Sequence, residues 1–502
     1  MYKLADRITA ARRVSAPLIY INSPDPSNSI HSIMDIFRNG DDKCPHPVIT
    51  WNVNQGARPM TDAAVPVIER MREAMESDDL ANPVDMLIGL EHAPAQAVVF
   101  MEHLSLFMDN PQVIQGLYDV RDEFKSNHRT LICVGPSMVI PKEVRQSFVI
   151  LDEPYPSPEE LHRIISVIVE SVERETDANL NFTDTKYNHS VDALRGLCAY
   201  TAEQEFSMSL SKDGIDIDGL WERKRIIIEQ TPGLSVYRPK ITMDDIGGCK
   251  NAKNFLSQLM LGKNSPKVIV WIDEIDKSTA ADKTDTSGVS QDRLGFILQY
   301  MQENESKGVV FLGPPGTSKS MMAKALGALT GILTIRLDLG EMLGGIVGES
   351  QHNLREAFKV ISAVADRDVL FIATCNNDDT MDSALQRRFK RGKIFFDLPE
   401  DDEKEVIWNL HMEKQGISEN DPKPDHASWT GAEIASCCEM AYDMDLTLRQ
   451  ASEYIVPVAV TAHKEIEALR SAANGRFISA AKPGFFYYSV QKKPKRAVKV
   501  ED

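Results

Sequence analysis

The chain has 502 residues, of which 42% are hydrophobic and 26% are charged, and its formal net charge is −18. This length is too great for one hydrophobic core, so we expect two or three domains. The acidic balance disfavours nucleic acid as a partner, because affinity for nucleic acid comes largely from clustered Lys and Arg. The charged N-terminus does not resemble a signal peptide, and no apolar run is long enough to span a membrane. We therefore expect a cytoplasmic protein without a membrane partner.

Residues 1–156 are predicted to form an α/β domain. Apolar runs predict strands at 17–22, 47–53, 97–102, 130–135 and 147–153. Helical segments lie between these runs, for example at 111–126, and the alternation implies a parallel sheet with helices on both faces. The domain contains no G-x-x-x-x-G-K-[ST] pattern, and the segment NSPDPSNS after its first strand has no Lys to hold phosphates. We therefore expect a docking or regulatory domain that does not hydrolyse nucleotides.

The rest of the chain repeats this organisation. Residues 157–240 are predicted to form a helical subdomain that ends in the linker TPGLSVYRPK. A second α/β domain is expected over 241–397, with strands at 267–273, 308–312, 332–338, 369–374 and 393–397. A helical region follows over 398–475, and the basic tail 476–502 is expected to be mobile.

The segment GPPGTSKS follows an apolar strand and precedes a helix, which is the context of a phosphate-binding loop. Backbone N–H groups there would point at phosphate oxygens, Lys319 would reach the β- and γ-phosphates, and the hydroxyl of Ser320 would ligate Mg²⁺. Ser318 stands where the usual pattern has Gly, so binding would be weakened if the loop needs a positive φ there. The predicted phosphate contacts are Gly313, Pro314, Pro315, Gly316, Thr317, Ser318, Lys319 and Ser320.

Acidic and polar residues follow two other strands of this domain. In KVIVWIDEIDK, Asp273 would hold Mg²⁺ and Glu274 would polarise an attacking water. Asn376, after the strand VLFIATC, could orient the same water, although a surface Asn in a turn is the alternative. The basic cluster between residues 387 and 393 could stabilise a transferring phosphoryl group from a neighbouring subunit, although a solvated basic loop is the alternative.

Together these motifs resemble the AAA ATPases, as do DDIGG at 244–248 and WTGAEI at 429–434. Over nearly the whole chain the sequence is similar to an uncharacterised AAA family encoded in cyanobacterial and algal plastid genomes, with a degenerate ATPase-like N-terminal half. In that family's terms the loop 313–320 is the Walker A motif and Asp273-Glu274 is the Walker B motif. The resemblance implies an α/β P-loop NTPase domain with a C-terminal helical lid, ATP and Mg²⁺ as cofactors, and a homo-oligomeric ring, with a hexamer as one candidate.

The resemblance also implies roles for single residues. Backbone contacts from Asp245, Ile246 and Gly247 would line the adenine pocket, and His411 would lie near the ribose, with a plain helix-surface His as the alternative. Asn376 would be the first sensor, and Arg388 and Arg391 occupy the two arginine-finger positions. Gly431 and Ala432 stand where some ATPases carry a sensor Arg, and Ile346 and Val347 fill the position of an aromatic pore residue.

The order of the motifs departs from the family pattern, in which the phosphate loop precedes the Asp-Glu strand. Here Asp273 and Glu274 come before Lys319, so we interpret the strand–helix unit 267–306 as transposed. Catalytic sites are defined by geometry, and a transposed parallel strand keeps its direction. The cost falls on the connection from the helix 291–304 to the phosphate-loop strand, which must skip a strand through about four residues.

These expectations support an ATP hydrolase of the AAA type that couples ATP binding and hydrolysis to the remodelling of a protein partner. The alternative is a nucleotide-gated scaffold that binds ATP with little or no turnover, because Ser318 and the transposition could weaken hydrolysis. A nucleic-acid motor is disfavoured by the net charge and by the lack of an evident groove with aromatic and basic residues.

Overall fold

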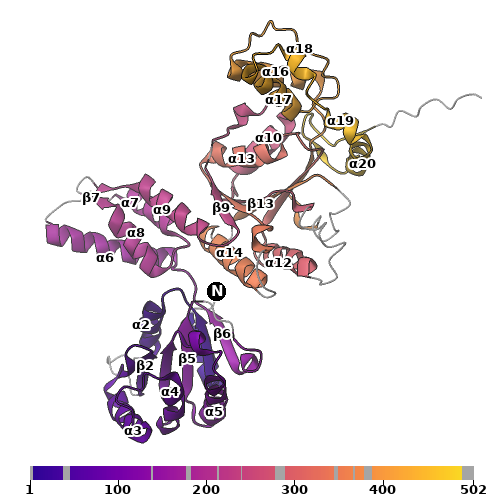
Figure 1. The fold of residues 1–502 in the computed structure, drawn as a ribbon. Helices are drawn as coiled ribbons and strands as arrows, with labels where there is room; N and C mark the ends of the chain where they lie inside the picture. The colour runs from indigo at the N-terminus through magenta and orange to yellow at the C-terminus, as the bar shows by residue number, and fades with distance from the viewer. Residues whose placement is uncertain are drawn as a thin grey trace, which may run out of the picture. The chain divides into compact units, whose positions relative to one another are not determined.

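The computed structural model describes residues 4–37, 46–136, 140–176, 183–211, 214–238, 240–276, 289–343, 349–365, 368–377 and 387–488. The chain divides into two compact units, Met1–Leu220 and Trp221–Asp502, and each is described by itself. None of the helices in the described ranges combines the length and the hydrophobicity that a membrane span requires. Both units contain the predicted parallel sheet flanked by helices (Figure 1).

The first unit is built on a six-stranded sheet of order β3-β2-β4-β5-β1-β6. All neighbouring strands are parallel except β2 and β3. The sequence predicted every strand except β3, which is short and lies at the edge. The strands are β1 (Leu18–Asn22), β2 (Val48–Asn52), β3 (Gly56–Pro59), β4 (Val98–Glu102), β5 (Thr130–Gly135) and β6 (Phe148–Asp152).

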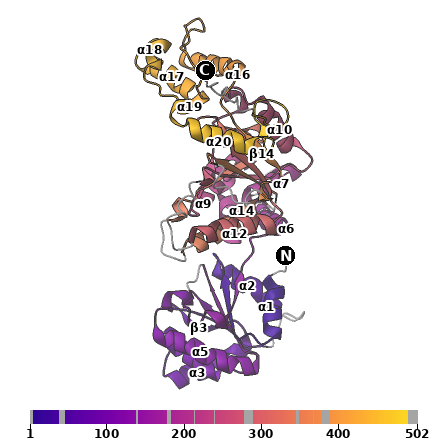
Figure 2. The same ribbon diagram turned by 90° about the vertical axis from the view of Figure 1, so that its right-hand side faces the viewer.

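Helices cover both faces of this sheet (Figure 2). On one face lie α1 (Leu4–Arg13) and α2 (Pro26–Phe37); on the other lie α3 (Val65–Met75), α4 (Pro83–Gly89) and α5 (Pro111–Asn127). Single 3-10 turns occur at Asp62–Ala64, Leu90–His92, Leu104–Phe107 and Arg145–Ser147. The expected helical subdomain then follows as α6 (Pro158–Thr176), α7 (Asp184–Leu194), α8 (Ala199–Ser209), the hairpin β7 (Leu210–Ser211) and β8 (Gly214–Ile215), and α9 (Ile217–Glu229), which begins in the first unit and ends in the second.

The second unit is built on a seven-stranded sheet of order β15-β14-β11-β13-β10-β12-β9. All pairs are parallel except that of β9 and β12. The central strands are apolar and buried on both faces, as parallel strands covered by helices require. The strands are β9 (Leu234–Tyr237), β10 (Val268–Ile272), β11 (Lys307–Leu312), β12 (Leu333–Leu337), β13 (Val369–Cys375), β14 (Gly392–Phe395) and β15 (Ile478–Ser479).

Two pairs of helices sandwich this sheet (Figure 1). Helices α10 (Lys250–Leu261) and α13 (Lys319–Thr330) pack on one face, where Leu256, Phe311 and Leu326 share one core. Helices α12 (Val289–Glu303) and α14 (Glu349–Ala365) pack on the other, where the rings of Tyr300 and Phe358 stack with centroids 4.2 Å apart. Single 3-10 turns lie at Met243–Asp245 and Glu341–Leu343.

The predicted helical region after the sheet forms a small domain with its own core. Trp408, Trp429, Ile434 and Cys437 are buried together there. Its helices are α16 (Asp401–Gln415), α17 (Gly431–Asp443), α18 (Leu448–Ser452), α19 (Val458–Thr461) and α20 (His463–Ala473). We call this helical domain the lid.

Two segments differ from their expected roles. The expected linker at 231–240 contributes β9, which pairs with β12 as an antiparallel edge strand. The expected mobile tail is ordered over 476–488, because β15 extends the sheet beside β14 and the Phe486 ring packs 4.5 Å from that of Phe395. Both strands are short and lie at edges, so their pairing depends on tertiary contacts that the local sequence does not reveal. Residues 489–502 lie outside the described part of the chain.

The strand of the transposed unit, β10, is a central strand of the sheet. Strand β10 lies between β13 and β12, parallel to both, and β13 separates it from β11. The connection from α12 to β11 is therefore short and skips one strand, as expected. It closes with the N–H of Ser306 donating to Met301 O (2.9 Å) and that of Glu305 to Gln302 O (3.3 Å). This is the Schellman pattern, and Glu305 adopts the left-handed φ of 48° that usually selects Gly.

Replacing Glu305 by Gly should stabilise this unit by about 1 kcal/mol, because Gly adopts the left-handed conformation without the Cβ clash. Chemical denaturation with urea would measure the change as a higher midpoint. Glu305→Ala is the matched control, since it removes the same exposed carboxylate but keeps the Cβ, and it should not stabilise the unit. Equal effects of the two substitutions would contradict the strain argument.

Candidate functional site

The phosphate loop joins the end of β11 to the start of α13. Lys319 is the first residue of α13, and only 6% of its surface is exposed. Its Nζ donates to the carbonyl oxygens of Gly313 (2.7 Å) and Pro314 (2.6 Å). Burial lowers the pKa of Lys319 to about 8, although nearby Cys375 and carboxylates favour the charged form. An anion beside this ammonium would offset the cost of burying its charge.

The loop backbone is left-handed at two positions. Gly316 has a φ of 81° and Ser318 has a φ of 65°. The strain predicted for Ser318 is thus present in the structure, because a residue with a Cβ occupies a conformation that favours Gly. A Cβ at Gly316 would come within 2.7 Å of the Thr430 hydroxyl, so the lid allows no side chain there.

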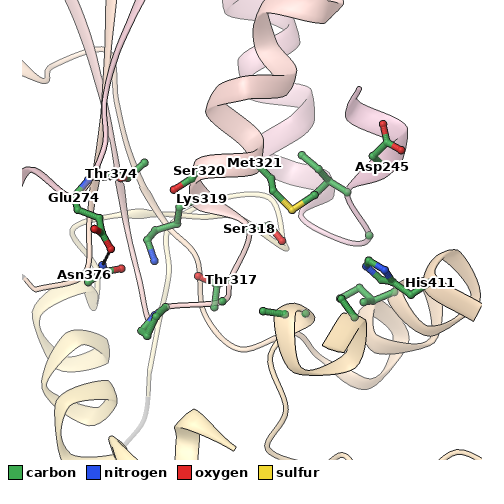
Figure 3. A pocket seen from close by; sticks show the side chains of 18 residues that line it. Asp245, Glu274, Thr317, Ser318, Lys319, Ser320, Met321, Thr374, Asn376 and His411 are labelled. Carbon is green, nitrogen blue, oxygen red and sulfur yellow. Dashed lines mark hydrogen bonds between the residues drawn. The ribbon is translucent and has the colours of Figure 1, made fainter. Parts of the chain in front are cut away.

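The carboxyl ends of three neighbouring strands bring polar side chains to this loop. The hydroxyl of Ser320 donates to Asp273 Oδ1 at 2.7 Å. The amide of Asn376 donates to Glu274 Oε1 at 3.3 Å, and its backbone N–H donates to Asp276 Oδ2 at 3.3 Å. Burial raises the pKa of Asp276. Figure 3 shows Glu274 and Asn376 on one side of Lys319, joined by this hydrogen bond.

Thr374 is a site residue that sequence reasoning missed. Its hydroxyl, in the almost fully buried strand β13, donates to Asp273 Oδ1 at 2.6 Å and accepts from the backbone N–H of Glu274 at 2.9 Å. The second bond holds Glu274 in a left-handed conformation with a φ of 48°. The available signal was a hydroxyl in an otherwise apolar strand, beside Asn376.

A cavity of about 310 Å³ runs from this acidic end past the phosphate loop to the lid. Figure 3 shows Asp245 and His411 at the end away from Glu274. Burial and nearby Lys414 lower the pKa of His411, and hydrogen bonds from Thr242 lower the pKa of Asp245. The lining residues are Asp245, Ile246, Gly247, Glu274, Pro315, Gly316, Thr317, Ser318, Lys319, Ser320, Met321, Thr374, Asn376, Ile407, His411, Gly431, Ala432 and Ala435.

Several predicted residues lie elsewhere or contribute only backbone. Gly313, Pro314 and Asp273 are not among the described residues that line the cavity. Gly313 and Pro314 bind Lys319 through their carbonyls, and Asp273 contacts the lining residue Ser320. Arg388 and Arg391 likewise do not line it. Arg388 donates to the Gln302 side chain of α12, and Arg391 is exposed just before β14.

At the lid, Gly431 and Ala432 line the cavity at the position considered for a sensor Arg, and the Ala432 N–H donates to Gly316 O at 3.2 Å. Ile346 and Val347, considered as pore residues, lie outside the described residues.

The donor set fits a triphosphate with Mg²⁺. Mg²⁺ prefers oxygen ligands and is usually held by one or two protein groups together with water and phosphate oxygens. The Ser320 hydroxyl and the Asp273 carboxylate offer such oxygens within 2.7 Å of each other, beside the buried Lys319 ammonium. The helix α13, 12 residues long, directs its N-terminus into the same cavity.

Comparison with known proteins relates two regions of this chain to AAA families. The model of the SpoVK-like AAA ATPase N-terminal domain matches residues 4–153, and that of the ATPase family associated with various cellular activities (AAA) matches 309–372. We name two regions after the families that they match: residues 4–153 are called the SpoVK-like domain, and the sheet and lid of the second unit are called the AAA domain. The match to the AAA domain begins in β11 and ends in β13, so the displaced strand β10 lies outside it.

The relatives of this chain differ in how much of it they match. The uncharacterized AAA domain-containing protein ycf46 of Guillardia theta is 22% identical over 467 residues, which cover 80% of this chain and 84% of the relative. The Cell division cycle protein 48 homolog of Archaeoglobus fulgidus is 24% identical over 305 residues, covering 49% and 38%. The 26S proteasome regulatory subunit 6B homolog of Dictyostelium discoideum is 29% identical over 184 residues, covering 27% and 45%. The resemblance to plastid AAA proteins is thereby confirmed.

The SpoVK-like domain places a carboxylate where the AAA domain places its phosphate loop. In this domain, α2 follows β1 as α13 follows β11 in the AAA domain. The buried Ser29 hydroxyl, in the first turns of α2, lies 2.6 Å from Glu153 Oε2 and 2.6 Å from Ser23 Oγ. Glu153 therefore brings negative charge to the N-terminal end of α2. This is the position that would otherwise be open to a phosphate.

Thr374→Val should destabilise the AAA domain by about 1–3 kcal/mol, because Asp273 Oδ1 loses one buried donor and the Glu274 N–H loses its acceptor. Thermal unfolding of the variant would show this as a lower melting temperature. Thr374→Ser keeps the hydroxyl and is expected to retain most of the stability. A Val variant as stable as the parent would show that the hydroxyl does not hold the two acidic residues.

Proposed function

We propose that this chain is an AAA-type ATP hydrolase, converting ATP and water to ADP and phosphate. The observation that carries the proposal is the 2.7 Å contact between the Ser320 hydroxyl and Asp273, beside the buried Lys319 ammonium. This contact joins the phosphate loop to the acidic strand despite their inverted order in the chain. Relatives described as AAA domain-containing proteins support the same proposal.

In this proposal each group has a distinct role. Lys319 and the loop N–H groups bind the β- and γ-phosphates, and Ser320 and Asp273 hold Mg²⁺ directly or through water. Bound Mg²⁺ supplies electrostatic stabilisation to the transferring phosphoryl group. Asn376 orients the Glu274 carboxylate, which takes up a proton from the attacking water as general base. The adenine and ribose lie at the end lined by Ile246, Gly247 and His411.

The site is proposed to be completed by a second copy of the chain. Transfer of a phosphoryl group spreads charge over oxygens that a guanidinium stabilises. Arg388 and Arg391 precede β14 and, as described above, do not line the cavity of their own chain. A ring of identical subunits would place them at a neighbour's site. We propose such a homo-oligomer, with ATP-driven remodelling of a protein partner as its work.

A nucleotide-gated scaffold is the second candidate function. The left-handed Ser318 favours it. Backbone strain in the phosphate loop could leave ATP bound with its γ-phosphate poorly placed for hydrolysis. Phosphate release and nucleotide-dependent assembly, measured in parallel on the same sample, separate the two functions. Binding and assembly without phosphate release would support the scaffold and contradict the hydrolase.

Glu274→Gln should bind ATP but release phosphate at least about a hundredfold more slowly, because the amide cannot take a proton from water. Lys319→Ala should instead lose nucleotide affinity, since it removes the buried ammonium. Phosphate release and equilibrium binding of ATP measure the two effects. If both variants hydrolyse ATP at the rate of the parent, the proposed roles are wrong.

Mixing two inactive variants tests the shared site. Arg388→Ala with Lys319→Ala should recover ATPase activity, because a subunit with an intact Lys319 can then adjoin one with an intact Arg388. The control mixture, Glu274→Gln with Lys319→Ala, should stay inactive because both defects lie in the same subunit's part of the site. Activity that does not depend on protein concentration, with no recovery in the first mixture, would contradict the shared site.

A further inference from the structure

One face of the lid helix α16 runs along the loop 245–249, which we call the base-end loop. This loop lines the end of the cavity at which we place the adenine base. Glu403, Ile407 and His411 are each four residues apart, so their side chains lie on one face of the helix. Ile407 and His411 line the cavity. Glu403 lies one turn before them, with only 9% of its surface exposed, although it is a carboxylate. A buried carboxylate needs hydrogen-bond donors, so the donors to Glu403 show which segments it connects.

Glu403 binds the backbone of the base-end loop. Its Oε1 accepts from the N–H of Cys249 at 2.7 Å, and its Oε2 accepts from the N–H of Glu400 at 3.3 Å in its own helix. The approach is close, since a Cβ added at Gly248 would lie 2.8 Å from Glu403 Oε1. At Gly247 an added Cβ would lie 2.4 Å from Ile407. The loop backbone and the lid helix are therefore in direct contact.

The other side of the same loop is held by its own neighbours in the sheet domain. Lys253 of α10 donates to Ile246 O at 2.5 Å, and the Asp245 carboxylate accepts from the Thr242 N–H at 2.7 Å. The Lys253 contact fixes the loop to α10 of the sheet domain, the Thr242 contact closes the loop's own turn, and neither involves the lid. The Glu403–Cys249 bond joins the loop to the lid, so it sets how closely the loop backbone approaches Ile407 and His411.

We propose that Glu403 is a positioning residue, which fixes the base-binding loop against the lid helix and so determines the affinity for the nucleoside part of the nucleotide. The proposal rests on the function proposed above. The phosphate loop has its own contacts, through Lys319 and through the Ala432 N–H to Gly316 O. Loss of Glu403 should therefore weaken recognition of the base and ribose while the triphosphate subsite keeps its affinity.

The test compares ADP with Mg²⁺-tripolyphosphate, which carries the phosphates but no nucleoside, by calorimetric titration of the full chain. Glu403→Ala should weaken ADP about tenfold and leave tripolyphosphate unchanged, because a charge-assisted hydrogen bond to the loop is lost. Glu403→Gln keeps an acceptor oxygen and should weaken ADP less. In steady-state kinetics the Ala variant should have a KM about tenfold higher and an unchanged kcat. The lost interaction is expected to stabilise the bound substrate and the transition state equally.

Asp402→Ala is the matched control, because it removes an exposed carboxylate from the same first turn of α16, and it should bind ADP like the parent. Equal losses of ADP and tripolyphosphate affinity in Glu403→Ala would overturn the positioning role, as would ADP affinity equal to that of the parent. If the parent itself binds neither ligand, the proposed function fails and this inference fails with it. If the parent binds both and only the Glu403 prediction fails, the proposed function stands.

Discussion

The candidate site of the AAA domain depends on one contact, the hydrogen bond from the Ser320 hydroxyl to the Asp273 carboxylate. The two residues belong to the loop after β11 and the end of β10, which are not neighbours in the sheet. They meet because β13 lies between them and its Thr374 hydroxyl reaches the same carboxylate oxygen. Three parallel strands therefore have to end at the same level for this site to exist.

Parallel direction explains why the inverted chain order is compatible with such a site. Moving a strand together with its following helix leaves the carboxyl end of the strand at the same edge of the sheet. What changes is the path of the chain, which here must pass from α12 to β11 across β13 within residues 304–306. The left-handed Glu305 marks where this path turns most sharply. The altered order thus strains the backbone at an exposed turn. It leaves the arrangement of the polar side chains around Asp273 and Ser320 unchanged.

The sequence was informative where one local pattern determines the outcome. The strand at β10 is predicted because all five of its residues are apolar, and the phosphate loop because Lys319 and Ser320 stand between a strand and a helix. Strands β9 and β15 escaped prediction because short edge strands acquire their pairing from the rest of the fold. Thr374 and Glu403 were not predicted for a related reason. Each accepts a hydrogen bond from a backbone N–H far away in the chain, and the local sequence pattern gives no sign of such a contact.

Strained backbone in the candidate site occurs at residues that neighbouring segments hold in place. Ser318 and Glu274 both have left-handed φ angles, a conformation that costs of order 1 kcal/mol or more for residues with a Cβ. Glu274 is held there by the bond from its N–H to Thr374, and the loop around Ser318 is held by the lid, where Ala432 binds Gly316. The contact between Ala432 and Gly316 persists only while sheet and lid stay together, so the conformation of the phosphate loop depends on the position of the lid. Because the lid also binds the loop 245–249 through Glu403, both ends of the cavity contact the same domain.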